Sequence, residues 1–136
     1  LLLGLRTAEV KALAVRDVDA DGSHLCVAMG EYAGKTAHAP RRLQVAQAGL
    51  RDLLLARRQA RPGDAPLLGG AEGLGEKALP SQLARACRAL SLPRVCPHSL
   101  RGLHASLAVE HGASIEHVAA ALGHSHAKVT QQHYLC

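Results

Sequence analysis

The sequence predicts an α+β fold that is mostly helical, with a small antiparallel sheet near the N-terminal half. Three observations lead to this prediction. Apolar residues recur at helical spacing in several segments after residue 45, short β-leaning runs occur between residues 24 and 47, and there is no internal repeat. The length of 136 residues fits one domain, so we expect residues 1–136 to form a single domain.

The first part of the chain is expected to hold one short helix and the sheet. Residues 7–14, "TAEVKALA", place Val10 and Leu13 on one helical face, and the Asp- and Gly-rich stretch "VRDVDADGSH" predicts a turn after them. The runs "HLCVAMG", "EYAGKTA" and "RRLQVAQ" are separated by Gly and Pro and favour short strands.

Two amphipathic helices are expected next. Residues 46–60 carry three leucines on one face and the basic side chains Arg57 and Arg58 on another, and "RPGDAP" ends this helix. Residues 81–90 again show apolar side chains at helical spacing, and "SLPRVCP" ends that segment.

Three more helices are expected after Pro97. Ser114 and Gly123 fit the two ends of the middle one, because Ser is a favoured N-cap residue and Gly is favoured just after a helix. The three segments are residues 99–111, 114–122 and 126–133.

The composition favours a polyanionic partner. The chain has 16 Lys and Arg against 11 Asp and Glu, a formal net charge of +5, and cations that neutralise phosphates gain free energy through counterion release. A basic composition without functional meaning is the alternative at this stage. Phe and Trp are absent, so the core must be aliphatic and no aromatic platform for stacking bases is expected.

The cysteines and the start of the chain favour a cytoplasmic protein. The cysteines have no C-x-x-C spacing, which argues for a reduced compartment without disulfides. The apolar residues 1–3 run into Gly and Arg too soon for a signal peptide or a membrane span, so no membrane association is expected. The four cysteines are Cys26, Cys87, Cys96 and Cys136.

Several cationic side chains are placed where a phosphate could bind. His98 and Arg101 lie three positions apart at the start of a predicted helix, near N-terminal amides that favour an anion. Arg6 stands at the start of another predicted helix, where a guanidinium can bind two nonbridging oxygens. Lys35 is expected at a hairpin tip, from which it could reach into a groove.

Five short stretches combine these residues in one order: "GLRTAEV", "GKT" followed by "RR", "HSLRG", "LGH", and a tyrosine ten residues beyond that last His. In this order and at about this spacing they resemble the tyrosine recombinases, the phage integrase family. The resemblance runs from Gly4 to Tyr134, essentially the whole chain. It implies the catalytic-domain fold of that family and a site-specific DNA recombinase.

The resemblance implies how the phosphate would be bound and attacked. Arg6 and Arg101 would clamp the scissile phosphate and stabilise the charge of the transition state. Tyr134 would attack the phosphorus and form a 3′-phosphotyrosyl bond, leaving a free 5′-hydroxyl. Glu9, one helical turn after Arg6, would support that arginine, although a surface ion pair with a neighbouring cation is an equal alternative.

Three further side chains receive roles from the resemblance. His98 would be the general base, Lys35 would protonate the leaving 5′-oxygen, and His124 would donate a hydrogen bond to the phosphate. A phenol with a pKa of about 10 is mostly protonated at neutral pH, so a base and a cationic pocket are needed to make it a nucleophile.

No cofactor or metal is expected. A covalent phosphotyrosine preserves the energy of the broken bond, so rejoining needs no ATP. A zinc site built on His124, His126 and His133 would need a fourth ligand and a spacing that a helix does not provide.

Double-stranded DNA is the expected partner, bound by a homotetramer in the full-length protein. Arg41 and Arg42 are expected either on a solvated strand face or against the DNA backbone. Because the N-terminal core-binding domain of the family has no counterpart in the sequence, we expect a catalytic fragment of a longer recombinase that integrates or excises DNA. A DNA-binding remnant that cannot cut, and an activity like that of type IB topoisomerases, are the alternatives.

Overall fold

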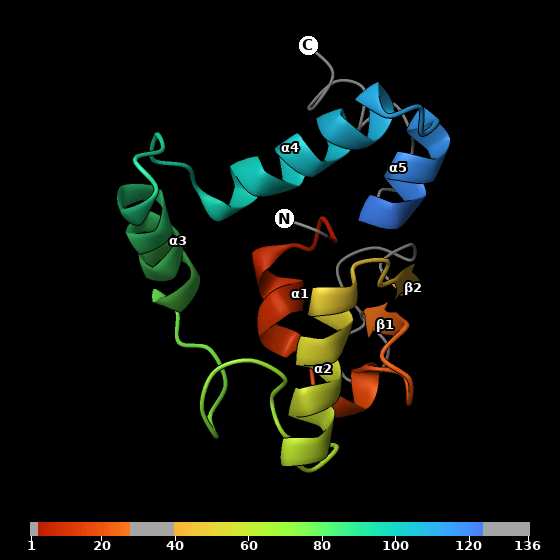
Figure 1. Ribbon diagram of the computed structural model, residues 1–136, viewed down its shortest axis with the longest axis vertical. Helices are drawn as coiled ribbons and strands as arrows, with labels where there is room; N and C mark the ends of the chain where they lie inside the picture. The colour runs from red at the N-terminus through yellow and green to blue at the C-terminus, as the bar shows by residue number, and fades with distance from the viewer. Residues whose placement is uncertain (1–2, 28–39, 124–136) are drawn as a thin grey trace. The chain divides into compact units, whose positions relative to one another are not determined.

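The described part of the chain forms two compact units. The structure, a computed structural model, describes residues 3–27 and 40–123. The sheet unit consists of residues 8–27 and 40–73, and the helical unit consists of residues 3–7 and 74–123. Within these residues the fold is mostly helical with one two-stranded antiparallel sheet, so the predicted fold class is confirmed (Figure 1).

The described α-helices and strands follow one another in the predicted order, and a 3-10 helix lies in the predicted turn after residue 14. No helix of the described residues is long and apolar enough to cross a membrane. The sheet unit contains the 3-10 helix η1 (Val15–Asp17), strands β1 (His24–Val27) and β2 (Arg41–Gln44), helix α2 (Ala48–Ala60) and all but the first residue of helix α1 (Thr7–Ala12). The helical unit contains α3 (Ala78–Ala89), α4 (Pro97–Glu110) and α5 (Ile115–Leu122).

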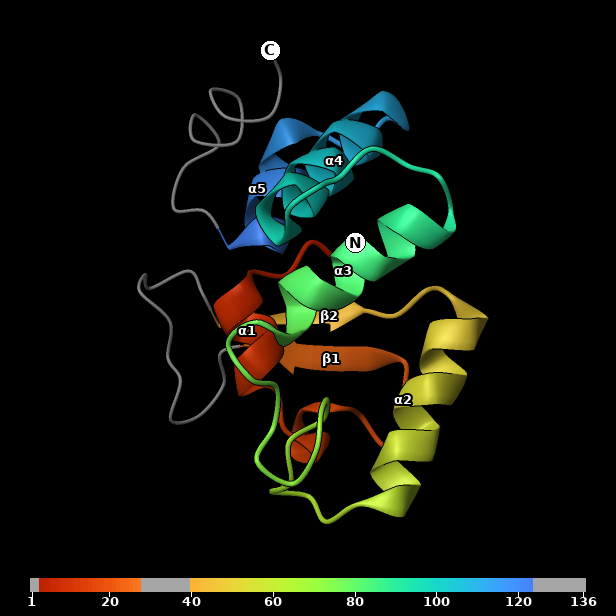
Figure 2. The same ribbon diagram turned by 90° about the vertical axis from the view of Figure 1, so that its left-hand side faces the viewer.

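The sheet buries one face of its two strands. Strands β1 and β2 run antiparallel with Leu25 opposite Leu43, and Figure 2 shows the two strands side by side. Because side chains alternate along a strand, Leu25 and Val27 point to the same side, and both are fully buried. Two of the predicted β runs therefore contain strands, while the third, residues 31–37, lies outside the described residues.

Helix α2 packs within the sheet unit through a buried leucine and through one arginine. Leu54 is buried, whereas Leu53 is 52% exposed, so the apolar stripe is narrower than the sequence predicts. Arg58 donates from Nη1 to the carbonyl oxygen of Val18 at 2.7 Å. Part of the predicted basic face thus holds the backbone of the same unit.

A buried ion pair joins α1 to β2. The Arg41 guanidinium donates to both carboxylate oxygens of Glu9, at 2.9 and 3.0 Å. The two side chains are only 8% and 2% exposed. A bidentate pair of this kind fixes the orientation of both groups, and it ties the helix to the sheet.

Replacing Arg41 with Ala is expected to destabilise the protein strongly. The substitution removes the bidentate guanidinium from the buried Glu9 carboxylate, and breaking a buried pair in this way costs about 3–5 kcal/mol. The neighbouring Arg42→Ala variant is the control, because Arg42 is 59% exposed where it pairs with Asp19. Urea denaturation followed by circular dichroism measures both; equal losses of stability would contradict the structural role of the Glu9–Arg41 pair.

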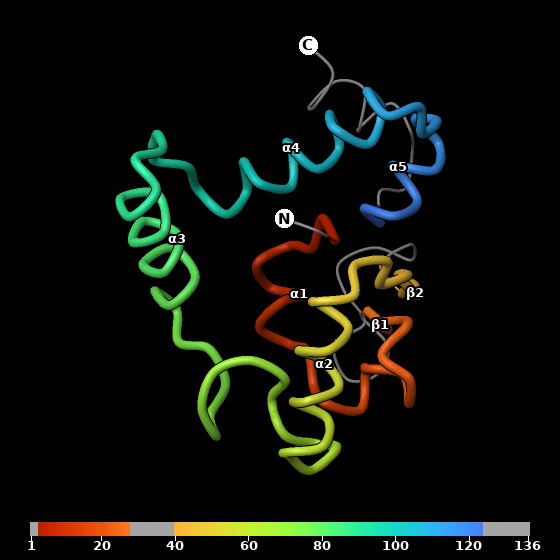
Figure 3. The backbone as a smooth tube through the Cα atoms, viewed as in Figure 1, coloured from red at the N-terminus to blue at the C-terminus, as the bar shows by residue number. Residues whose placement is uncertain are grey.

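In the helical unit, a short connection joins the end of α4 to the start of α5 (Figure 3). The Ser114 hydroxyl accepts a hydrogen bond from the backbone N–H of His117 at 3.3 Å and caps the start of α5. Gly123 ends that helix in the left-handed conformation, with φ of 67°. Both predicted end residues of this helix are therefore confirmed.

Apolar side chains of α4 and α5 form a buried cluster. Ala105, Val118 and Leu122 are buried together, and partly buried apolar residues surround them. Leu122 is fully buried in this cluster, so the last turn of α5 is fixed by packing. The carbonyl groups at that end of α5 accept hydrogen bonds from Arg6 and Arg101, so their position affects the site.

Candidate active site

The first turn of α4 carries two of the predicted site residues. Pro97 occupies the first turn and Cys96 caps it, so the helix begins two residues earlier than the sequence predicts. His98 is exposed, and Arg101 follows it at a spacing that places both on one side of the helix. Arg101 is 2% exposed, an unusual degree of burial for a cation.

Two backbone carbonyl groups hold Arg101. Its Nη1 donates to the carbonyl oxygen of Gly4, and its Nη2 donates to that of Leu122. Hydrogen bonds to charged donors are stronger than neutral ones, and together these two restrict rotation of the guanidinium. Arg101 therefore has a fixed orientation at the end of α5.

Arg6 reaches the same end of α5. Its Nη2 donates to the carbonyl oxygen of Gly123 at 3.1 Å. The last carbonyl groups of a helix carry partial negative charge, which favours a cation there. Arg6 and Arg101, which are 95 positions apart in the sequence, are thus brought to adjacent carbonyl groups of residues 122 and 123, directly before His124.

Three predicted residues lie outside the described part of the chain. They are Lys35, His124 and Tyr134. Their roles stay predictions, as does the helix expected at residues 126–133. Among residues 3–27 and 40–123, no three His, Cys, Asp or Glu side chains form a group that could hold a metal ion.

Glu9 and the two arginines of strand β2 form ion pairs within the sheet unit. Glu9 pairs bidentately with Arg41, and its expected support of Arg6 stays a prediction. Arg41 is therefore buried within the sheet unit, which favours a structural role over the DNA contact considered for it. Arg42 is exposed and donates to Asp19.

A thiol that the sequence patterns did not single out lies just before His98. The Ser99 hydroxyl and the Ser99 backbone N–H both lie within hydrogen-bond distance of Cys96 Sγ, at 3.0 and 3.4 Å, and they lower the pKa of the thiol. Cys26, Cys87 and Cys96 are free thiols.

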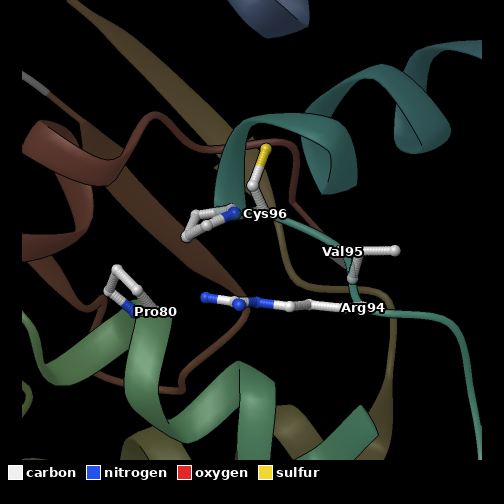
Figure 4. A pocket seen from close by; sticks show the side chains of 5 residues that line it. Pro80, Arg94, Val95 and Cys96 are labelled. Atoms are coloured by element: carbon white, nitrogen blue, oxygen red, sulfur yellow. The ribbon is translucent and has the colours of Figure 1, made fainter.

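Cys96 also lines a pocket of about 240 Å³ between α3 and α4. Figure 4 shows the Arg94 side chain extending across this pocket toward Pro80. Val95 and Pro97 complete the lining. The pocket places a cation and a thiol beside the turn that carries His98, just before the "HSLRG" stretch.

The chain was compared with known protein families and with curated proteins. The sequence model of the phage integrase family matches residues 1–136. No curated protein matches the chain.

Solved structures of recombinases share the fold. The XerA recombinase superposes with a TM-score of 0.80 at 20% sequence identity, covering 98% of this chain and 49% of that one. The Tn1549 transposon integrase in complex with transposon right end DNA gives 0.74 at 19% identity, covering 98% and 51%. The XerH site-specific recombinase bound to difH substrate gives 0.73 at 22% identity, covering 96% and 38%. The present chain thus spans about half the length of these proteins or less.

Proposed function

The chain belongs to the phage integrase family, and on that premise we propose that it is the catalytic part of a site-specific DNA recombinase. It cuts and rejoins DNA strands through a 3′-phosphotyrosine intermediate, for integration or excision of DNA. The tyrosine-recombinase fold supports this proposal. The whole protein is proposed to act as a homotetramer on two duplexes.

The observation that carries the proposal is that Arg6 and Arg101 donate hydrogen bonds to adjacent residues of the chain. Both guanidinium groups donate to the carboxyl end of α5, at Gly123 and Leu122. Two oriented guanidinium groups in one place suit a phosphate, because their planar donors match its oxygens. Preorganised donors of this kind stabilise charge that develops in the transition state.

The remaining steps are assigned to residues by the family pattern. Tyr134 attacks the phosphorus and its oxygen replaces the 5′-oxygen of the adjoining nucleotide. His98 takes the phenolic proton, Lys35 gives a proton to the leaving 5′-oxygen, and His124 donates to a nonbridging oxygen. The reaction exchanges one phosphodiester for another, so the reverse attack by a 5′-hydroxyl rejoins the strand without ATP.

Helix α3 offers a surface for the DNA backbone. Arg85 and Arg88 lie one turn apart on α3 and are exposed. Residues 77–109 contain no Asp or Glu. In the described part of the chain neither arginine forms an ion pair, whereas the exposed Arg16 pairs with Asp64. An uncompensated pair of cations favours phosphate contact, which releases counterions.

Replacing Arg85 and Arg88 with Ala is expected to weaken DNA binding for all sequences alike. The plot of log affinity against log salt should become shallower by about 0.9 for each phosphate that the variant no longer neutralises. Fluorescence anisotropy over a series of salt concentrations measures this slope. Arg16→Ala is the control, since its charge is already paired with Asp64. An equal change of slope in both variants would contradict the proposal that α3 contacts the DNA backbone.

The proposed activity is tested by trapping its intermediate. The chain is incubated with labelled duplexes whose arms are randomised and whose cleaved strand carries a nick close to the centre, so that the short released fragment diffuses away. A slowly migrating protein–DNA adduct on a denaturing gel supports the recombinase. DNA binding without any adduct supports a remnant that cannot cut. Relaxation of supercoiled plasmid without site preference supports a topoisomerase.

A further inference from the structure

Gly4 provides a backbone carbonyl group that accepts a hydrogen bond from Arg101. Another acceptor, the carbonyl group of Leu122, is fixed by helix α5. Gly4 lies in a segment without helix or strand, so no regular hydrogen-bond pattern fixes its carbonyl group. The position of that oxygen therefore depends on how the backbone of Gly4 packs.

The backbone of Gly4 packs too closely for any side chain. Its φ of +60° is in the left-handed region, which favours glycine. A Cβ atom at this position would lie 2.6 Å from Cδ2 of His104 and 2.8 Å from Cδ2 of Leu122. Since Leu122 is fully buried, its methyl group has little room to move away.

Both neighbours of Gly4, His104 and Leu122, are also connected to Arg101. His104 lies on α4 three residues after Arg101, and Leu122 provides the second carbonyl acceptor. Gly4 is thus pressed against the helix that carries the guanidinium and against the residue that shares in binding it. A shift of Gly4 would move the acceptor relative to Arg101.

We infer that Gly4 is a positioning residue for Arg101: its left-handed backbone, seated against His104 and Leu122, sets its carbonyl oxygen where it orients the guanidinium toward the phosphate. The inference rests on the proposed function of Arg101. Small displacements of groups that bind the reacting phosphate cost rate out of proportion to their size, because the transition state needs them in one geometry.

The kinetic test is a double-mutant cycle between Gly4 and Arg101. Gly4→Ala is expected to lower the single-turnover rate of adduct formation about 100-fold at saturating DNA, while DNA affinity stays unchanged. In an Arg101→Ala background the same substitution should cost no further rate, because Gly4 acts through that arginine. An equal loss in both backgrounds, or no loss in the first, overturns the inference.

Gly112→Ala is the matched control for backbone strain. Gly112 also has a positive φ, +90°, but a Cβ atom there would meet nothing within 4 Å. It should therefore carry the strain of a left-handed alanine without moving a neighbour, and the rate should stay at the wild-type value. A loss equal to that of Gly4→Ala would mean that strain alone explains the effect.

A second measurement separates positioning from activity. In ¹⁵N-labelled protein, the Nη–H signals of Arg101 are identified by their absence in Arg101→Lys. Resolved signals in the wild type that merge in Gly4→Ala support the inference even if no adduct forms, in which case the proposed function alone fails. Unchanged signals overturn it. If circular dichroism shows that Gly4→Ala is unfolded, His104→Ala, which removes the neighbouring ring, is measured by the same criterion.

Discussion

Replacing Tyr134 with Phe is expected to abolish the covalent protein–DNA adduct while DNA binding keeps its strength and its salt dependence. The substitution removes only the phenolic oxygen, which is the proposed nucleophile. DNA affinity is expected to depend mainly on exposed cations such as the α3 arginines, none of which changes. Denaturing gels of the nicked duplexes measure the adduct, and anisotropy measures binding.

The chain provides its own control for this substitution. Tyr32 is its only other tyrosine, so Tyr32→Phe removes the second phenol and should leave adduct formation intact. An adduct that persists in Tyr134→Phe, or one that disappears in Tyr32→Phe, would assign the nucleophile elsewhere. Loss of binding together with loss of the adduct in Tyr134→Phe would instead indicate a folding defect.

Much of the helical architecture follows from local patterns in the sequence. The helix predicted at residues 46–60 is found at Ala48–Ala60, and Ser114 and Gly123 mark the ends of α5. Helix α3 begins at Ala78, three residues before the prediction, with Pro80 in its first turn. Proline is tolerated there because the first N–H groups of a helix have no partner within it. Helix ends of this kind depend on one or two residues, so they can be predicted from the local sequence.

The arrangement of the site could be predicted only in part. Motif spacing singled out Arg6 and Arg101, and both are held at the end of α5. The acceptors that orient them are backbone carbonyl groups, which every residue has, so no sequence pattern distinguishes them. The pairing of Glu9 with Arg41 spans 32 positions and depends on how α1 meets β2, which local patterns do not specify.

Replacing Arg101 with Ala is expected to lower the rate of adduct formation by about 10²–10³-fold, the loss typical of one preorganised donor to a developing negative charge. Arg101→Lys should recover little of this rate. Lysine keeps the charge, but its single ammonium group cannot match the planar fork that donates to both Gly4 and Leu122. Single-turnover cleavage of the nicked duplex at saturating protein measures both variants.

The same substitution also removes the hydrogen bonds to Gly4 and Leu122 from the fold, so a loss of rate needs a control for stability. Arg61 provides it, because that guanidinium also donates to two backbone carbonyl groups, those of Pro66 and Gly69, at 3.0 and 2.8 Å. Arg61→Ala should lower the urea midpoint yet keep the wild-type rate in folded protein. Equal rate losses in the two variants would mean that general stability is responsible. A loss of rate confined to Arg101→Ala would mean that Arg101 acts on the phosphate. Both arginines donate to backbone carbonyl groups, but only Arg101 is proposed to bind the phosphate.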